Sequence, residues 1–378
     1  MKEVNAIGQL ATLKTLILTK SNFSDTESSA LNKLSGLRNL DLTGTNTGDE
    51  TLKNLQGLKL QQIDLTGTKV TEKGLPSLAK IETLVTISLN DTEVGDKGLG
   101  SLSALKKLKA LNLNRTKVTE DALKQLSAYN ALDNLSLQDT EVTGATFDTV
   151  PALRFLIGLD LGGTKVNDST VGKLMSAPSL VSLNLSKTRV TDNGLAQLAK
   201  MKNLRELSLG GLQISDKGLH SIRGMKLRTL DLSGTNVTDK ALVPFKGATF
   251  LSIVNLNKTK VTDAALPTLG QIPNLAELYL SGTKVTDAGL KTISAFPKLE
   301  SLDFSDTEVT DAGCKSLSQM KNLHYVKVSG TSITPAGLHS LMRISAMARV
   351  DADNCKKLPK EALEKVQKDH PGSLVTGG

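Results

Sequence analysis

The chain has 378 residues, 3% aromatic residues, no tryptophan and a net charge of +8. It contains no run of about 18 consecutive apolar residues, so the sequence predicts no membrane insertion. The first residues also lack the basic start and continuous apolar run that a secretory signal needs. We expect such a chain in the cytoplasm as it stands, and secreted or periplasmic if a leader before Met1 was removed.

A Leu-x-x-Leu-x-Leu pattern occurs fifteen times between Leu13 and Met347, twelve times after an interval of 24 residues and twice after 23. A repeat of about 20 to 29 residues with this spacing is typical of leucine-rich repeats, which bury their apolar faces only by stacking. The sequence therefore predicts an α/β solenoid, a right-handed curved superhelix of about 15 repeats. A parallel sheet should form its concave face, and short helices its convex face.

The unbroken repeat register predicts one domain over residues 1–378. Ile7, Leu10 and Leu13 suggest that residues 1–12 form a capping helix before the first strand, followed by regular repeats over 13–346. Residues 347–378 should hold the last repeat and a C-terminal cap, in which a helix precedes a final short strand. Caps of this kind cover the leucine core that the end of a solenoid would otherwise expose.

The repeat that begins at Leu275 illustrates the strand. Leu278 and Leu280 alternate with Glu277, Tyr279 and Ser281. A period of two residues is that of a β-strand with one buried and one exposed face. We therefore expect the leucines to point inward and the other three side chains to line the concave surface.

The rest of this repeat predicts a turn and a short helix. Thr283 occupies a turn position that is threonine in twelve of the fifteen repeats, and stacked hydroxyls there could form an internal ladder between coils. Thr286 and Asp287 suit a helix N-cap and first turn. The helix should run through Phe296 and end at Pro297.

The repeat LxxLxLxxTxVTDxGLxxLxxLxx is clearest in the segments 188–195, 283–290 and 307–313. It resembles a bacterial class of leucine-rich repeat protein in which threonine replaces the cysteine of the cysteine-containing type. It is more distantly similar to ribonuclease-inhibitor-like proteins. The resemblance covers essentially the whole chain and implies a surface for recognition.

No constellation of residues predicts chemistry. The four histidines are far apart in the sequence and form no zinc motif. The recurring Gly-Thr-Lys, as at Gly282, follows a strand but lacks the remaining residues of a phosphate loop. We therefore expect no catalytic residue, no metal site, no cofactor and no enzymatic activity. Cys314 and Cys355 occupy a leucine and a threonine position, so a disulfide between them is not expected.

Charge is unevenly distributed over the predicted surfaces. The three outward strand positions carry nine acidic residues against Lys327 and Arg349, about −7 in total, which leaves about +15 for the other surfaces. With few aromatic residues for base stacking, we expect no nucleic-acid partner. Charges in the turns after the strands alternate in sign, as in Asp91, Arg115 and Asp139, and predict pairing between adjacent coils.

Two of the three tyrosines lie on the predicted concave face near the C-terminus, amid charged residues. We name this group the C-terminal patch; its members are Glu277, Tyr279, Ser301, Asp303, His324, Tyr325, Lys327, Arg349 and Asp351. Tyrosine and arginine are enriched among residues that carry binding energy. The patch predicts a monomeric recognition scaffold for a protein partner with a basic segment.

Three alternatives remain open at this point. The same residues would suit a glycan in the cell envelope, because carboxylates and amides beside an aromatic ring also bind sugars. The chain could be the substrate-recognition part of a larger multi-domain protein. The two tyrosines could also simply occupy the last coils without a ligand.

Overall fold

The computed structural model describes residues 11–126, 129 and 131–377. The chain divides into two compact units, Met1–Arg189 and Val190–Gly378, and each is described by itself. Sixteen strands of three residues each form in the described residues, eight in each unit. Among those residues, no helix is both long and apolar enough to cross a membrane.

The strands of the first unit are β1 (Thr15–Ile17), β2 (Asn39–Asp41), β3 (Gln62–Asp64), β4 (Thr86–Ser88), β5 (Ala110–Asn112), β6 (Asn134–Ser136), β7 (Gly158–Asp160) and β8 (Ser182–Asn184). Its α-helices are α2 (Asp49–Asn54), α3 (Leu75–Leu78), α4 (Asp96–Leu102), α5 (Glu120–Gln125) and α6 (Asp168–Val171). Its 3-10 helices are η1 (Ser28–Lys33), η3 (Phe147–Thr149), η4 (Pro151–Phe155) and η5 (Gly172–Ser176).

The strands of the second unit are β9 (Glu206–Ser208), β10 (Thr229–Asp231), β11 (Ile253–Asn255), β12 (Glu277–Tyr279), β13 (Ser301–Asp303), β14 (Tyr325–Lys327), β15 (Arg349–Asp351) and β16 (Leu374–Thr376). Its α-helices are α7 (Asp192–Leu198), α8 (Asp216–Leu219), α9 (Leu266–Leu269), α10 (Asp287–Ile293), α11 (Asp311–Leu317), α12 (Pro335–Met342) and α13 (Lys360–Asp369). Its 3-10 helices are η6 (His220–Ile222), η7 (Asp239–Phe245) and η8 (Asp263–Ala265).

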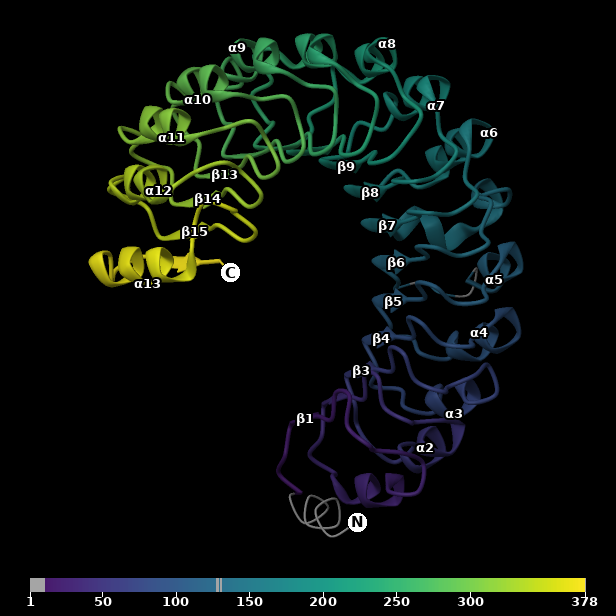
Figure 1. Ribbon diagram of the computed structural model, residues 1–378. Coiled ribbons are helices and arrows are strands. Elements are labelled where there is room, and N and C mark those ends of the chain that lie inside the picture. The colour runs from purple at the N-terminus through teal and green to yellow at the C-terminus, as the bar shows by residue number, and fades with distance from the viewer. Residues whose placement is uncertain (1–10, 127–128, 130, 378) are drawn as a thin grey trace. The chain divides into compact units, whose positions relative to one another are not determined.

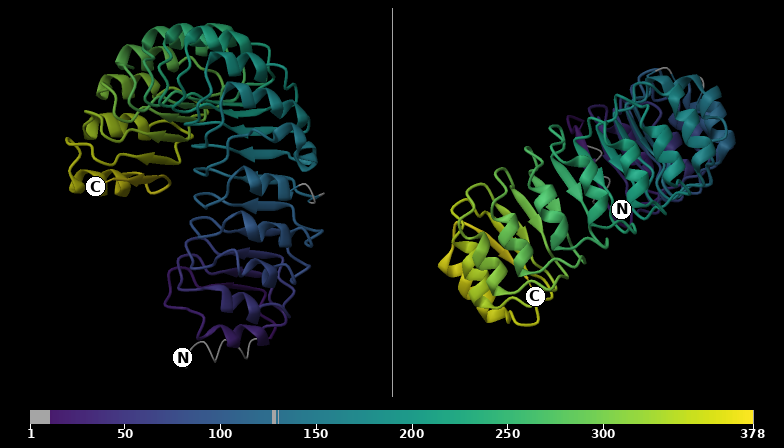
Figure 2. Two further views of the ribbon diagram at one scale, coloured as in Figure 1. Left: turned by 90° about the vertical axis from the view of Figure 1, so that its right-hand side faces the viewer. Right: turned by 90° about the horizontal axis from the view of Figure 1, so that it is seen from above.

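Within each unit the strands of consecutive coils pair in parallel at the same repeat position. Leu278 of β12, for example, lies opposite Leu302 of β13 and has no exposed surface. Figures 1 and 2 show the strands side by side, with the short helices on the opposite side of each coil. The parallel sheet, the helices and the buried leucines confirm the predicted leucine-rich repeat solenoid.

The helices begin where the sequence predicted but end earlier. α10 starts at Asp287, and the Thr286 side chain accepts a hydrogen bond from the Ala288 N–H, as an N-cap does. It ends at Ile293, so the prediction that it runs through Phe296 to Pro297 was wrong. The buried ring of Phe296 packs from the turn that follows.

The turn threonines do not form the predicted ladder between coils. In all twelve repeats that have a threonine there, its hydroxyl donates to the carbonyl oxygen three residues earlier in the same coil, at 2.6–2.7 Å. The Thr331 hydroxyl additionally lies 3.7 Å from the Cys355 thiol of the next coil. Cys355 replaces this threonine in the last repeat, and its thiol does reach the neighbouring coil, donating to the Val328 carbonyl at 3.2 Å.

A different ladder joins the coils, which we call the Asp–Thr ladder. An aspartate in the first turn of one helix accepts two bonds from the threonine or serine that precedes the next helix. Oδ1 accepts from its N–H and Oδ2 from its hydroxyl. The pairs are Asp49–Thr71, Asp96–Thr119, Asp192–Ser215, Asp216–Thr238, Asp239–Thr262, Asp263–Thr286, Asp287–Thr310 and Asp311–Thr334. The aspartate of the repeat motif therefore holds adjacent coils together, in addition to its effect on the helix dipole.

The turn after each strand requires a left-handed residue. The eighth residue of every repeat has positive φ, from +52° to +70°, and eight of these fifteen residues are not glycine. Gly282 takes this conformation at +67° without the steric cost that Lys258 meets at +55°. The glycine of Gly-Thr-Lys thus serves the turn, as the sequence suggested.

The predicted pairing of turn charges is confirmed in the first unit. Arg115 donates from Nε and Nη2 to the two carboxylate oxygens of Asp91, at 2.5 and 2.6 Å. Lys117 pairs with Glu93, and Lys165 with Glu141, again across adjacent coils. These pairs are solvent-exposed, so each contributes at most about 1 kcal/mol.

The two predicted capping elements have different outcomes. The proposed N-terminal capping helix lies almost entirely in residues 1–10, outside the described residues. At the other end, α13 and β16 confirm the predicted helix and final strand. Cys314 and Cys355 are free and buried, as expected. The single-domain assignment for 1–378 stays a prediction.

Candidate binding surface on the C-terminal sheet face

The residues of the C-terminal patch stand in two parallel columns across β12 to β16. The strand register places Glu277, Ser301, Tyr325, Arg349 and Leu374 in one column. It places Tyr279, Asp303, Lys327, Asp351 and Thr376 in the other. Adjacent members are separated by the spacing of neighbouring strands, about 4.8 Å. The fold therefore brings together eight of the nine predicted residues.

His324, the ninth, precedes β14 and is exposed at the edge of the sheet, with Nδ1 3.2 Å from the Asn322 carbonyl oxygen. Sequence reasoning missed Leu374 and Thr376. The final strand was predicted, but its register against β15 was not, and only that register assigns these two side chains to the patch.

Asp351 is the centre of a hydrogen-bonded network within the patch. Its Oδ1 accepts from Arg349 Nε at 2.7 Å and from the Thr376 hydroxyl at 2.5 Å. Its Oδ2 accepts from the Tyr325 hydroxyl at 2.6 Å. The Arg349 guanidinium also lies over the Tyr325 ring, 5.9 Å from its centre, within the range of a cation–π contact. Four side chains from three strands are thus held in one arrangement.

The electrostatics of the network follow from these contacts. Burial alone would raise the pKa of Asp351, but hydrogen bonds from Arg349, Thr376 and Tyr325 favour its charged form and lower the pKa below the usual 3.8. Burial, followed by the bond to Asp351, raises the pKa of Tyr325 to about 12. The tyrosine is therefore a neutral donor, and the aspartate an anion, at neutral pH.

The other half of the patch is arranged around Tyr279 and Asp303. The Tyr279 hydroxyl donates to Glu277 at 2.5 Å, and burial with this bond raises its pKa to about 12. Asp303 is buried, and its Oδ1 accepts from the Ser305 N–H at 2.9 Å. Lys327 lies between Asp303 and Asp351 in its column, and it forms no ion pair within the part of the chain that the structure describes.

The patch is less acidic toward solvent than its composition predicts. Asp303 and Asp351 are each only 7% exposed, and Asp351 is already paired with Arg349. A ligand could reach two acidic side chains. One is Glu277, which accepts a hydrogen bond from Tyr279, and the other is the exposed Asp353, which follows β15. No group of three or more histidine, cysteine or acidic residues suited to a metal ion occurs among the described residues.

A family model for the leucine-rich repeat matches residues 176–199, 225–246, 271–294 and 297–318. These segments share the repeat register with the stacked coils seen here. The chain has the leucine-rich repeat fold. No curated protein matches the chain in sequence.

Solved structures resemble this leucine-rich repeat protein in fold. A leucine-rich repeat protein of Leptospira interrogans is 21% identical with a TM-score of 0.59, covering 98% of this chain and 92% of its own. An internalin of Listeria monocytogenes is 19% identical with a TM-score of 0.52, covering 92% and 93% respectively. At these identities the likeness concerns the fold alone.

The first unit of the leucine-rich repeat protein has a hollow that the sequence did not indicate. It is a shallow space of about 320 Å³ on the sheet face of β1 to β4, lined among others by Ile17, Asp41, Asp64 and Ser88. Ile17 is 65% exposed there. It has no network comparable to that of Asp351: Asp41 accepts from the Thr19 hydroxyl and the Thr43 N–H, with no cationic partner among the described residues.

The lowered pKa of Asp351 predicts that acid loosens the last strand. A carboxylate whose folded pKa lies below its unfolded value, about 3.9, contributes stability at higher pH and loses it as the pH falls through the folded pKa. As the pH falls below about 4, we expect smaller amide protection factors at Leu374 to Thr376, where the protection factor is the intrinsic exchange rate at each pH divided by the observed rate. Asp351→Asn should remove part of this pH dependence. Identical acid profiles for the wild type and Asp351→Asn would contradict the assignment.

Proposed function

We propose that this leucine-rich repeat protein is a non-enzymatic, monomeric recognition scaffold that binds a partner protein through the C-terminal patch. The observation that carries the proposal is the Asp351 network, which fixes Arg349 and Tyr325 on the sheet face. Stacked repeats form extended surfaces that suit recognition of a large ligand.

The arrangement supports binding in two ways. Tyrosine and arginine bury large areas while keeping a directional polar group, and they are frequent among the residues that dominate binding energy. Arg349 and Tyr325 are also held by Asp351 before a ligand arrives, so less side-chain freedom is lost on association. Both side chains remain partly exposed.

The reachable charges suggest the chemistry of the partner. Glu277 and Asp353 offer carboxylates to a basic segment, whereas Asp351 is satisfied by Arg349. Lys327, which forms no ion pair with a residue that the structure describes, offers its ammonium group to an acceptor of the partner. We infer a partner segment with basic side chains at its edges and a polar acceptor near its centre.

A glycan in the cell envelope is the second candidate. Tyr279 and Tyr325 are half-buried rings beside carboxylate acceptors, an arrangement that also suits a sugar. The proposal that the chain is the substrate-recognition part of a larger protein would use the same surface. Binding to a glycan array without any protein present would favour the glycan.

The protein-recognition proposal predicts that Tyr325→Ala and Arg349→Ala each weaken binding by about 30-fold, because residues of this kind contribute about 2 kcal/mol or more. A photo-reactive residue at position 327 would first identify the partner by cross-linking, and the affinity of the purified pair would then be measured by calorimetry. Tyr325→Phe separates the loss of the hydroxyl from the loss of the ring.

Asn134→Ala is the matched control, because Asn134 occupies the same repeat position as Tyr325 on β6 of the first unit. It should leave the affinity unchanged. The proposal is wrong if the triple substitution of Tyr279, Tyr325 and Arg349 by alanine leaves the affinity for the cross-linked partner intact.

A further inference from the structure

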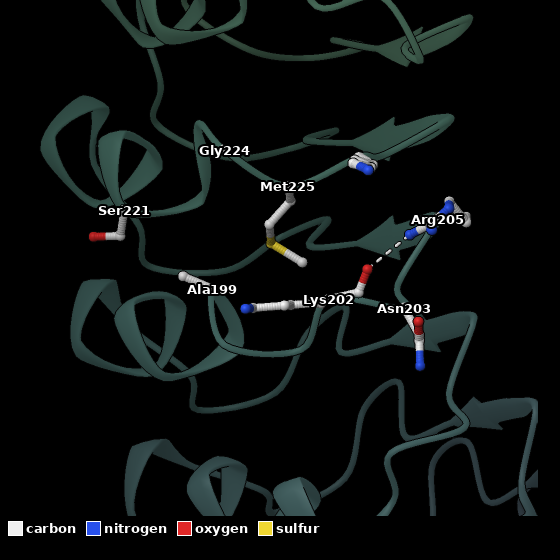
Figure 3. Close-up of a pocket in the computed structure, with 8 residues that line it drawn as sticks. Ala199, Lys202, Asn203, Arg205, Ser221, Gly224 and Met225 are labelled. Atoms are coloured by element: carbon white, nitrogen blue, oxygen red, sulfur yellow. Dashed lines mark hydrogen bonds between the residues drawn. The ribbon is translucent and has the colours of Figure 1, made fainter.

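The second unit has a hollow of about 420 Å³ on the edge where the chain passes from helix to strand. Lys202, Arg205, Ser221, Gly224, Met225 and Lys226 line it. Figure 3 shows the Lys202 and Met225 side chains next to one another, with Arg205 on the strand side and Ser221 on the helix side. The hollow precedes the C-terminal patch in the sequence, because the short repeat at Leu204 comes three repeats before the repeat at Leu275.

The hollow coincides with a short repeat. The repeat that begins at Leu204 has 23 residues, so one residue is missing from the segment before β10. Met225 is half-exposed there, whereas Met201 and Met320 at the same repeat position are only 7% and 6% exposed. The deletion thus leaves apolar surface at the floor of an open space.

Three basic residues, Lys202, Arg205 and Lys226, line this space, and four more lie on the same or the next helix-to-strand segment. We call these seven residues the basic rim. They lie on the three consecutive helix-to-strand segments 199–205, 223–228 and 246–252, which contain no acidic residue. They are Lys200, Lys202, Arg205, Arg223, Lys226, Arg228 and Lys246. All are exposed except Arg205, which is half-buried. Seven positive charges therefore gather within three coils of a chain whose net charge is +8.

Acidic side chains in the described part of the chain do not neutralise the charges of the basic rim. None of the seven forms an ion pair with a residue that the structure describes. Arg205 is positioned by backbone carbonyls instead, donating from Nη1 to Lys202 at 2.9 Å and to Leu204 at 2.8 Å. Three adjacent coils span only about 10 Å of sheet. Like charges at this density repel one another, and an anionic chain would relieve that repulsion.

We propose that the basic rim binds a linear sulfated polysaccharide. Such a chain brings closely spaced anionic groups to the lysines and C–H faces to the apolar floor at Met225. Lysine, as a compact point charge, suits sulfate, whereas carboxylates gain most from the free fork of an arginine. Four of the seven rim residues are lysines, and Nη1 of Arg205 is already engaged by two backbone carbonyls.

Nucleic acid fits the basic rim less well. Single-stranded nucleic acids gain affinity by stacking bases on aromatic rings. Phe250 is the one aromatic residue of the three segments, and Lys226 lies over its ring at 5.5 Å from the centre. One face of this single ring is therefore covered by the ammonium group, which leaves few surfaces for base stacking.

The test is binding of a fluorescent heparin fragment to the full chain, measured by anisotropy at several salt concentrations. Gly224→Glu places an acid at the hollow, and no atom lies within 4 Å of the added Cβ. We expect it to weaken heparin binding at least tenfold and to flatten the salt dependence. Lys202→Glu with Lys226→Glu should abolish binding.

Gly57→Glu is the matched control. Gly57 occupies the same position in the other 23-residue repeat, and its added Cβ also meets no atom within 4 Å. It changes the net charge equally but should leave affinity within twofold. Equal losses for both variants, or equally tight binding of single-stranded DNA, polyphosphate or polyglutamate, would overturn the proposal. None of these outcomes bears on the C-terminal patch.

Discussion

Phe304→Ala is expected to lower the free energy of unfolding by about 3–5 kcal/mol, as large-to-small substitutions of buried aromatic residues do. Phe304 follows β13, has no exposed surface and occupies the third leucine position of its repeat. Leu280 and Val328 stand at the same position in the adjacent coils and are fully buried as well. The void left by alanine removes packing contacts with both adjacent coils, so the substitution weakens the stacking of the coils.

Urea unfolding of the full chain and amide exchange at β13 and β14 would measure this loss. The Phe304 N–H donates to the Lys327 carbonyl at 3.0 Å, so its exchange rate reports directly on the joint between these coils. Phe304→Leu restores the residue that most repeats have and should cost less than about 1.5 kcal/mol. Equal destabilisation by alanine and leucine would refute the packing account.

Asp287→Ala is expected to cost about 2 kcal/mol, because hydrogen bonds to a charged group contribute about 1.5–3 kcal/mol. Asp287 Oδ1 accepts from the N–H groups of Thr310 and Gly313 at 2.8 and 3.0 Å, and Oδ2 from the Thr310 hydroxyl at 2.6 Å. Without the carboxylate these donors at the start of α11 lose their partner. Amide exchange at Thr310 and Gly313 should accelerate most.

A double-mutant cycle tests whether Gly313, the glycine of the TDxG motif, is required because a larger side chain there would clash with the Asp287 carboxylate. A Cβ on Gly313 would lie 2.5 Å from Asp287 Oδ1, so Gly313→Ala should displace the carboxylate and destabilise the wild type. In the Asp287→Ala background the same change should cost at least about 1 kcal/mol less, since the closest contact is removed and alanine favours a helix. The contacts with Val309 Cγ1 at 3.0 Å and Leu290 Cδ1 at 3.1 Å remain in both backgrounds. Additive effects would show that the two positions are independent.

The regular features of the fold were predictable from the local sequence of one repeat. The period of the leucines and the alternation at Glu277 to Ser281 each follow from local geometry that repeats in every coil. The N-cap at Thr286 and the helix start at Asp287 were correct for the same reason. The early end of α10 at Ile293 was not predictable from Pro297, because the chain turns back toward the sheet several residues before the proline.

The candidate site was predictable only in part. Position in the repeat placed Tyr279, Tyr325 and Arg349 on one face, which the strand register confirms. The bond from Tyr325 to Asp351 and the inclusion of Thr376 depend on how neighbouring strands align. The charge count overestimated the acidity of the patch, because a count of residues includes neither the burial of Asp303 and Asp351 nor the ion pair between Asp351 and Arg349.

The sequence by itself determined the solenoid, the face on which each side chain lies and the places where coils change length. Repetition makes this possible, because every coil has the same local backbone geometry and similar residues at equivalent positions. Contacts between coils were decided only by the tertiary structure. The hydroxyls of the turn threonines, such as Thr283, bond within their own coil, whereas the aspartates at the helix starts, such as Asp287, bond to the next coil. These partners depend on the distance between stacked coils, which the sequence of a single repeat does not contain.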